Sequence, residues 1–208
     1  MVDNPFHGCS GIESIVVDRE NKVFASPRNC NAIINTVTKT LVTGCSNTVI
    51  PKGVTMIGEG AFISCRNLTS IKIPNGVTKI GQDAFGLCRN LEKVVLPNSV
   101  TSIGESAFSE CKSLASINIP GGVTSIGRSA FSGCEYLTSI SIPKGLKTIE
   151  ENTFFGCYRL TKIIIPDCVK SIGNWAFYDC RNLTTVKISG RDIEIAPKAF
   201  LYCPGYER

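Results

Sequence analysis

A period of 23 residues runs through the chain and limits its possible folds more than any other feature. Three residue types keep this step in one shared register. They are proline at Pro51, Pro74, Pro97, Pro120, Pro143 and Pro166, phenylalanine at Phe62, Phe85, Phe108, Phe131, Phe154, Phe177 and Phe200, and cysteine at Cys65, Cys88, Cys111, Cys134, Cys157, Cys180 and Cys203. A unit this short cannot bury its apolar residues alone, so the copies must stack on one another.

Each copy has eight apolar positions, which indicate one coil of a solenoid. In the first full copy these are Val54, Ile57, Ala61, Phe62, Cys65, Leu68, Ile71 and Ile73. Leu68–Ile73 predicts a short strand whose alternate residues point inward, and Pro74 ends it because proline cannot donate a ladder hydrogen bond. Val54–Gly58 is expected to return along the other side, while Ala61–Cys65 is too short for a helix and predicts a turn or 3₁₀ segment. We therefore predict a mainly β repeat solenoid with coils about 4.8 Å apart, forming a rod about 40 Å long.

The whole chain, residues 1–208, is expected to form one solenoid with irregular ends. Residues 1–17 match part of a repeat, residues 49–189 hold the regular repeats and residues 190–208 an incomplete terminal repeat. Because the chain begins and ends within a repeat and shows no polar cap, we expect a segment of a longer protein.

One repeat, in residues 18–48, is enlarged. Strand-like stretches lie at Lys22–Ser26, Ala32–Asn35 and Thr40–Thr43, and Thr36–Lys39 between the last two is suited to a hairpin turn. This pattern predicts a small antiparallel insert near the N-terminus.

The recurring residues resemble those of the leucine-rich repeat family, and more closely its BspA-like subclass of bacterial and protist surface proteins. The match is carried by Ile57-Gly58, Ala61-Phe62, Cys65, Leu68, Ile71 and Ile73-Pro74 and their later copies, from about Val49 to Cys203. The resemblance implies a leucine-rich-repeat solenoid, at the cell surface or secreted, that mediates adhesion or protein recognition without chemistry. An intracellular interaction scaffold and a purely structural spacer of a longer surface protein are the alternatives.

The cysteines are predicted to be buried free thiols that pack as small apolar side chains. Stacked cysteines about 4.8 Å apart with parallel Cβ vectors exceed the Cβ separation of a disulfide, roughly 3.5–4.5 Å. The sequence has no C-x-x-C pair, and its His/Cys spacing fits no zinc site. Cys30 with Cys9 or Cys45 is the one disulfide that we consider. Cys168, at a loop position, is expected to be the most exposed and most reactive thiol.

Outward-facing residues of the predicted strands form the first candidate binding surface, which by resemblance is the concave sheet of the family. They are Ser70, Lys72, Lys93, Val95, Ser116, Asn118, Ser139, Ser141, Lys162, Ile164, Thr185 and Lys187. Small polar residues with scattered lysines suit a protein or glycan ligand, on host matrix or another cell surface. The face lacks stacked aromatics and dense Arg/Lys, which argues against nucleic acid. A solvated sheet without a ligand is the alternative, and it explains Val95 and Ile164 least well.

A second candidate surface is an aromatic edge near the C-terminus. Its residues are Phe155, Tyr158, Trp175, Tyr178, Leu201 and Tyr202. The edge is either an interface, including one for self-association, or a surface that packs against further repeats or a cap. A basic column of Arg66, Arg89, Lys112 and Arg181 indicates a solvated loop edge, with polyanions such as sulfated glycans as the functional alternative.

The sequence carries no pattern of an enzyme or a cofactor protein. It has one histidine, His7, and no G-x-S-x-G elbow, P-loop or paired catalytic carboxylates. Cys9 lies at a core position, which argues against a Cys9–His7 nucleophile pair. The N-terminus does not resemble a signal peptide, and no apolar run approaches the roughly 18 residues of a membrane helix. We therefore expect no catalytic residue, cofactor, metal or transmembrane segment.

Overall fold

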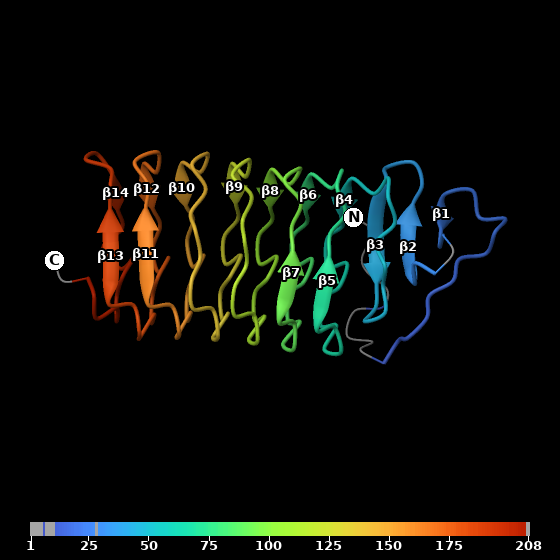
Figure 1. Cartoon of the computed structure of the whole chain (residues 1–208), viewed down its shortest axis with the longest axis horizontal. Coiled ribbons are helices and arrows are strands. Elements are labelled where there is room, and N and C mark those ends of the chain that lie inside the picture. The colour runs from blue at the N-terminus through green and yellow to red at the C-terminus, as the bar shows by residue number, and fades with distance from the viewer. Residues whose placement is uncertain (1–5, 7–10, 28, 207–208) are drawn as a thin grey trace.

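The chain winds into a β solenoid whose coils are stacked in sequence order (Figure 1). The computed structural model describes residue 6 and residues 11–27 and 29–206. Its register repeats the period of the sequence, since Ser70 pairs with Lys93 and Ile57 with Ile80. The described residues form strands and turns and no helix, which confirms the predicted repeat solenoid. The segment Ala61–Cys65 is a turn.

Two rows of parallel strands run along the solenoid. The front row comprises β5 (Ser70–Lys72), β7 (Lys93–Val95), β11 (Lys162–Ile165) and β13 (Thr185–Ile188). The back row comprises β4 (Met56–Ile57), β6 (Lys79–Ile80), β8 (Ser102–Ile103), β9 (Ser125–Ile126), β10 (Thr148–Ile149), β12 (Ser171–Ile172) and β14 (Glu194–Ile195). In the front row β5 pairs with β7 and β11 with β13, while a single bridge joins Ser116 to Ser139 between these two pairs.

The predicted antiparallel insert is confirmed, and it extends the back row. Strands β1 (Phe24–Ala25), β2 (Ala32–Asn35) and β3 (Thr40–Gly44) pair antiparallel in that order, and β3 then pairs in parallel with β4. The hairpin between β2 and β3 is closed by Asn35, whose Oδ1 accepts hydrogen bonds from the N–H groups of Val37 and Thr38.

A third ladder of hydrogen bonds joins the coils on the turn side. The N–H of Phe85 donates to the carbonyl of Ala107 at 2.8 Å, one coil further along the chain. The turn needs two left-handed residues around the phenylalanine, and Asp83 (φ 50°) and Leu87 (φ 61°) supply them in this coil. Where the strands of both rows also pair, each coil is therefore hydrogen-bonded to the next on three sides.

The core is a continuous column between the rows. The repeat phenylalanines stack face to face with centroids 4.8 to 5.6 Å apart from Phe62 to Phe200. All eight positions predicted to point inward in the first full copy are buried. Burial of a phenylalanine ring stabilises the fold by about 1.5–3 kcal/mol, so the ladder is a principal source of cohesion between coils.

Glycines at the ends of the back strands allow the coils to approach closely. A Cβ on Gly104 would lie 2.7 Å from the carbonyl carbon of Gly81, and one on Gly81 would lie 2.8 Å from that of Gly58. Glu150 occupies the same repeat position in a later coil. The back row is interrupted there, because the seven-stranded sheet ends at β9 and a three-stranded sheet begins at β10.

The partial repeat expected in residues 1–17 stays a prediction. Ile15, at the repeat position of the buried Ile71, is buried as that match requires. Phe6, at the repeat position of Phe62, is 36% exposed. His7 and Cys9, and any pairing of Cys9 with Cys30, lie outside the described residues.

Candidate functional site

The front row gathers all twelve residues of the first predicted surface onto one exposed face. Inward residues such as Ile71, Val94 and Ile163 are buried, and because strand side chains alternate, their neighbours point to solvent. The exposed residues are Ser70, Lys72, Lys93, Val95, Ser116, Asn118, Ser139, Ser141, Lys162, Ile164, Thr185 and Lys187. We call this surface the front face.

The front face is mildly basic and carries two apolar side chains. Four of its twelve residues are lysines and none is acidic. Val95 is 42% exposed and pairs across the sheet with Lys72, and Ile164 is 46% exposed and pairs with Lys187. An exposed aliphatic side chain beside an ammonium group suits an amphipathic ligand that carries negative charge.

A hollow of about 420 Å³ lies on the front face around Ile164. It is lined by Ser139, Ile140, Ser141, Ile142, Lys144, Lys162, Ile164 and Pro166. The sequence prediction included four of these residues and did not include Ile140, Ile142, Lys144 and Pro166. Ile140 and Ile142 are inward residues of the repeat. Lys144 and Pro166 lie in the proline-containing loops, so their position is the only sequence signal for them.

The aromatic edge is partly self-packed. The rings of Phe155 and Tyr178 stack at 4.9 Å, and Tyr178 meets Tyr202 edge-on at 5.2 Å. Leu201 and Tyr202 remain 40% and 63% exposed. The structure therefore brings four of the six predicted residues into one column.

The other two residues of the aromatic edge lie against cations. The guanidinium carbon of Arg181 is 5.0 Å from the ring centre of Tyr158, and Nζ of Lys198 is 5.5 Å from that of Trp175. A related contact places Arg159 3.8 Å from the ring centre of Tyr136. These rings are already covered on one side by a cation, which reduces the face that they offer to a ligand.

A pocket of about 570 Å³ lies at the C-terminal end of the core column. Its lining residues are Arg181, Ala196, Pro197, Phe200, Leu201, Tyr202, Cys203, Pro204 and Tyr206. The ring of Tyr206, which occupies the repeat's leucine position, stacks on Phe200 at 4.3 Å. Tyr206 thus covers part of the last phenylalanine.

A further hollow of about 570 Å³ lies where the insert joins the back row. It is lined mainly by short polar side chains, including Thr38, Thr40, Thr55 and Thr78, with Glu59 and Lys79. The sequence prediction did not include it, because the pairing of β3 with β4 that forms it is specific to the insert.

The basic column is partly neutralised. Nζ of Lys112 lies 2.5 Å from Oε1 of Glu135, which raises the pKa of Lys112, and Asp179 raises the pKa of Arg181 by a two-point hydrogen bond at 2.8 and 3.0 Å. Arg66 and Arg89 are exposed on the same edge. Two free positive charges give only a weak field for a polyanion.

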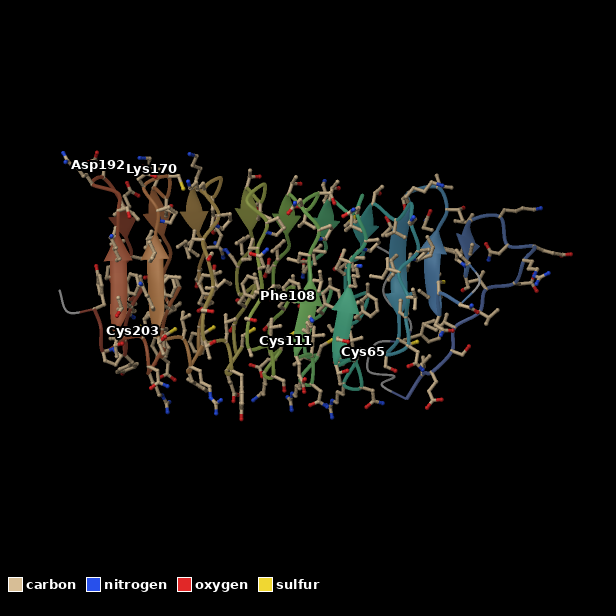
Figure 2. The ribbon with its side chains drawn as sticks, viewed as in Figure 1. Cys65, Phe108, Cys111, Lys170, Asp192 and Cys203 are labelled. Carbon is tan, nitrogen blue, oxygen red and sulfur yellow. The ribbon has the colours of Figure 1, made fainter. Side chains whose placement is uncertain are left out.

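The repeat cysteines form a buried column (Figure 2), as predicted, and the six from Cys88 to Cys203 each donate a hydrogen bond that the sequence did not reveal. Sγ of Cys88 donates to the carbonyl of Phe62 at 3.0 Å, and the later copies repeat this contact at 2.8 to 3.3 Å. Burial raises the pKa of Cys65 to about 11 and raises the pKa values of Cys88, Cys111, Cys134 and Cys157 still further. These thiols stay protonated near neutral pH.

The remaining described cysteines are also free thiols. Cys30 and Cys45 are both buried and unpaired with each other, and Cys45 occupies the repeat position that Leu68 holds in the next coil. Cys168 is half-buried, which makes it the most exposed of the ten described cysteines.

The described part of the chain shows no group of three or more His, Cys, Asp or Glu side chains that could hold a metal ion. Within the same residues, no helix is long and apolar enough to cross a membrane.

Comparison with known structures agrees with this geometry. The chain is 27% identical to a T. pallidum leucine-rich repeat protein, with a TM-score of 0.70 over 93% of this chain and 91% of that one. A leucine-rich cell surface protein of Faecalibacterium prausnitzii gives 27% identity and a TM-score of 0.63, covering 84% of this chain and 56% of that one. A leucine-rich repeat protein of Bacteroides ovatus gives 30% identity and a TM-score of 0.56, covering 83% and 52%. The chain thus spans little more than half of the last two structures.

No curated protein sequence matches the chain. A family model for the BspA type leucine rich repeat region, in six copies, matches residues 40–144 and 103–207. These matches cover all the regular coils and their phenylalanine and cysteine columns. The chain therefore belongs to the BspA type leucine-rich repeat family.

Proposed function

We propose that the chain is a non-catalytic binding module that recognises a protein or glycan ligand along its front face, at the cell surface or in a secreted protein. One observation carries the proposal: Ile164 is 46% exposed at a hollow, on a face with four lysines and no acidic residue. Ile164 does not stand singly, because Ile140, Ile142 and Pro166 line the same hollow, and apolar side chains grouped at an exposed hollow are typical of a binding site.

Support for a surface location comes from the F. prausnitzii relative, which is described as a cell surface protein. The two alternatives make different predictions. A spacer binds no ligand at all, and an intracellular scaffold binds cytosolic partners rather than matrix proteins or glycans.

The experiment is a binding array of host matrix proteins, glycans and bacterial surface material, probed with the labelled chain. The test variant is Lys93→Glu/Lys162→Glu/Ile164→Asp, which reverses charge and removes the apolar point on the front face. A matched control, Lys79→Glu/Lys170→Glu/Val37→Asp, makes the same changes at exposed positions of the back row and the insert. Circular dichroism of both variants serves as the control that they fold as the wild type does.

The proposal expects a ligand that binds the wild type and the control and is lost in the front-face variant. A ligand retained by the front-face variant would move recognition to the C-terminal aromatic edge. An array without any ligand would favour the spacer or the scaffold.

A further inference from the structure

One step of the solenoid lacks strand pairing on both rows, and it lies between the coil of Phe131 and the coil of Phe154. On the back row β9 does not pair with β10. On the front row, the described backbone makes no hydrogen bond between residues 139–142 and 162–165. The rings of Phe131 and Phe154 are 5.6 Å apart, the widest spacing in the phenylalanine ladder. We call this place the open step.

Glu150 accounts for the loss of pairing on the back row. At the equivalent position of the neighbouring coils, a Cβ on Gly127 would lie 2.5 Å from the N of Glu105, and one on Gly173 would lie 2.7 Å from the N of Glu151. A Cβ added to either of these glycines would therefore clash with the backbone of the preceding coil at the present spacing. The glycine N–H donates to the preceding coil in the regular steps, as from Gly127 to Ile103 at 2.9 Å. Ala196 occupies this position in the terminal repeat and keeps its bond to Ile172 at 2.9 Å.

A second substitution in the same coil adds volume. Thr153 stands where the other regular coils have alanine, and it is fully buried. Its hydroxyl donates to the carbonyl of Glu150 at 2.7 Å. Both changes add atoms between the same two coils.

The turn side remains closed across the open step. Ser129 donates to Glu151 at 3.0 Å, and Phe131 donates to Thr153 at 2.9 Å. The N–H of Thr161 also donates to the carbonyl of Thr138 at 3.5 Å, just before the front row. The coils are thus joined on the turn side and weakly at the start of the front row, and they lack strand pairing along both rows. Front-row pairing is also absent between residues 93–95 and 116–118 and is a single bridge between Ser116 and Ser139, but only at the open step do both described rows lack strand pairing.

The front hollow of about 420 Å³ lies on this open step, because Ser139–Ile142 belong to one coil and Lys162–Pro166 to the next. Its apolar part is formed by Ile164, with Pro166 and the edges of Ile140 and Ile142, and its polar part by Ser139, Ser141, Lys144 and Lys162. Asp167 follows Pro166 but does not line the hollow. An apolar hollow bordered by two ammonium groups suits an aliphatic side chain with carboxylates on either side.

We propose that Glu150 holds the open step apart and that the front hollow takes one aliphatic side chain of an acidic peptide segment from a partner protein. This inference rests on the proposed recognition at the front face. Glu150 acts as a positioning residue, on the far side of the coil from the ligand. A peptide fits better than a neutral glycan, because the apolar lining complements an aliphatic side chain and the lysines complement its acidic neighbours.

The test uses a library of fluorescein-labelled acidic pentapeptides, with aspartate at the outer positions and every amino acid in turn at the centre. Binding is measured by fluorescence anisotropy at low and at physiological salt. The chains compared are the wild type, Glu150→Gly, Ile164→Ser and the control Ala196→Gly, which makes a similar change at the same repeat position of the terminal repeat. Amide hydrogen exchange on Glu150→Gly shows whether the back row has closed, through protection of the amide at position 150.

We expect leucine or isoleucine at the centre to bind best, and about ten-fold better than serine. We expect Ile164→Ser to weaken that peptide about ten-fold, and Glu150→Gly to weaken it about as much while gaining protection at position 150. Ala196→Gly should bind as the wild type does.

Equal affinity for all central residues, or unchanged binding in Glu150→Gly once protection is gained, would overturn the inference. Absence of binding by every acidic pentapeptide would also overturn it. The proposed function fails separately, when the array ligand is retained by the front-face variant. A glycan lost in that variant, with no acidic peptide bound, would leave the proposed function standing and this inference wrong.

Discussion

Sγ of Cys111 donates a hydrogen bond to the carbonyl oxygen of Phe85, 3.2 Å away in the preceding coil. The same carbonyl accepts the N–H of Cys88 at 3.2 Å. The repeat thus ties its two most regular columns, phenylalanine and cysteine, into one contact between coils. A cysteine at this position fills a small apolar space and also supplies a weak donor to a buried carbonyl.

Stability should fall at alkaline pH because of these thiols. Burial raises the pKa values of the five repeat thiols from Cys65 to Cys157 in the folded chain, while an unfolded thiol ionises at about pH 8.5. Below that pH both states hold the proton and the free energy of unfolding is unaffected. Above it the unfolded state alone loses protons, so each thiol lowers the free energy of unfolding by about 1.4 kcal/mol per pH unit until its folded pKa is reached, about 11 for Cys65.

Urea denaturation between pH 7.5 and about pH 10.5, under reducing conditions, measures this effect. In the double variant Cys111→Ala/Cys134→Ala the free energy of unfolding should fall less steeply with pH than in the wild type. The difference in slope should be about twice the contribution of one thiol. Equal slopes in the two chains would mean that these cysteines do not retain their protons in the folded state.

Cys168 should be alkylated first among the described cysteines. It is half-buried, with Sγ 3.4 Å from the carbonyl of Leu146, whereas the other nine are buried. Iodoacetamide labelling followed by peptide mass mapping gives the order of reaction, with a urea-unfolded sample as the control in which all thiols react. Early labelling of Cys88 or Cys134 would contradict the closed core.

Gly104→Ala should open the back row between β6 and β8. Its Cβ would lie 2.7 Å from the carbonyl carbon of Gly81, which is backbone and cannot move alone. We expect a loss of about 1–3 kcal/mol in the free energy of unfolding. Ala196→Gly should change it by under about 1 kcal/mol, because that coil already admits a Cβ. Thermal denaturation of the two variants measures both losses of stability. Equal losses would contradict the role of the close approach between coils at Gly104.

Self-association through the C-terminal aromatic edge remains a proposal with a direct test. Leu201 and Tyr202 are exposed beside the stacked rings of Phe155 and Tyr178. Sedimentation velocity over a range of concentrations should show a dimer in the wild type that is lost in Leu201→Asp/Tyr202→Asp and kept in Lys93→Glu/Lys162→Glu. A wild type that sediments as a monomer at every concentration would reject this interface.

The sequence predicted the solenoid, the inward column and the front face because these follow from which positions are apolar. It did not predict the left-handed turn residues, since Asp83 and Leu87 carry no glycine or asparagine signal. Glu150 is visible as a departure from a glycine column, but its effect depends on a backbone approach under 3 Å that only the stacked coils reveal. The hollow likewise joins residues of two coils, and its Lys144 and Pro166 follow strands rather than lying in them.

The most direct test of front-face recognition is hydrogen exchange of the chain with and without the ligand that the array selects. Slower exchange confined to residues 139–142 and 162–165, two stretches that do not pair with each other in the described front row, is the predicted result. Slower exchange at residues 199–206, with none on the front row, would contradict the account and place recognition at the aromatic edge.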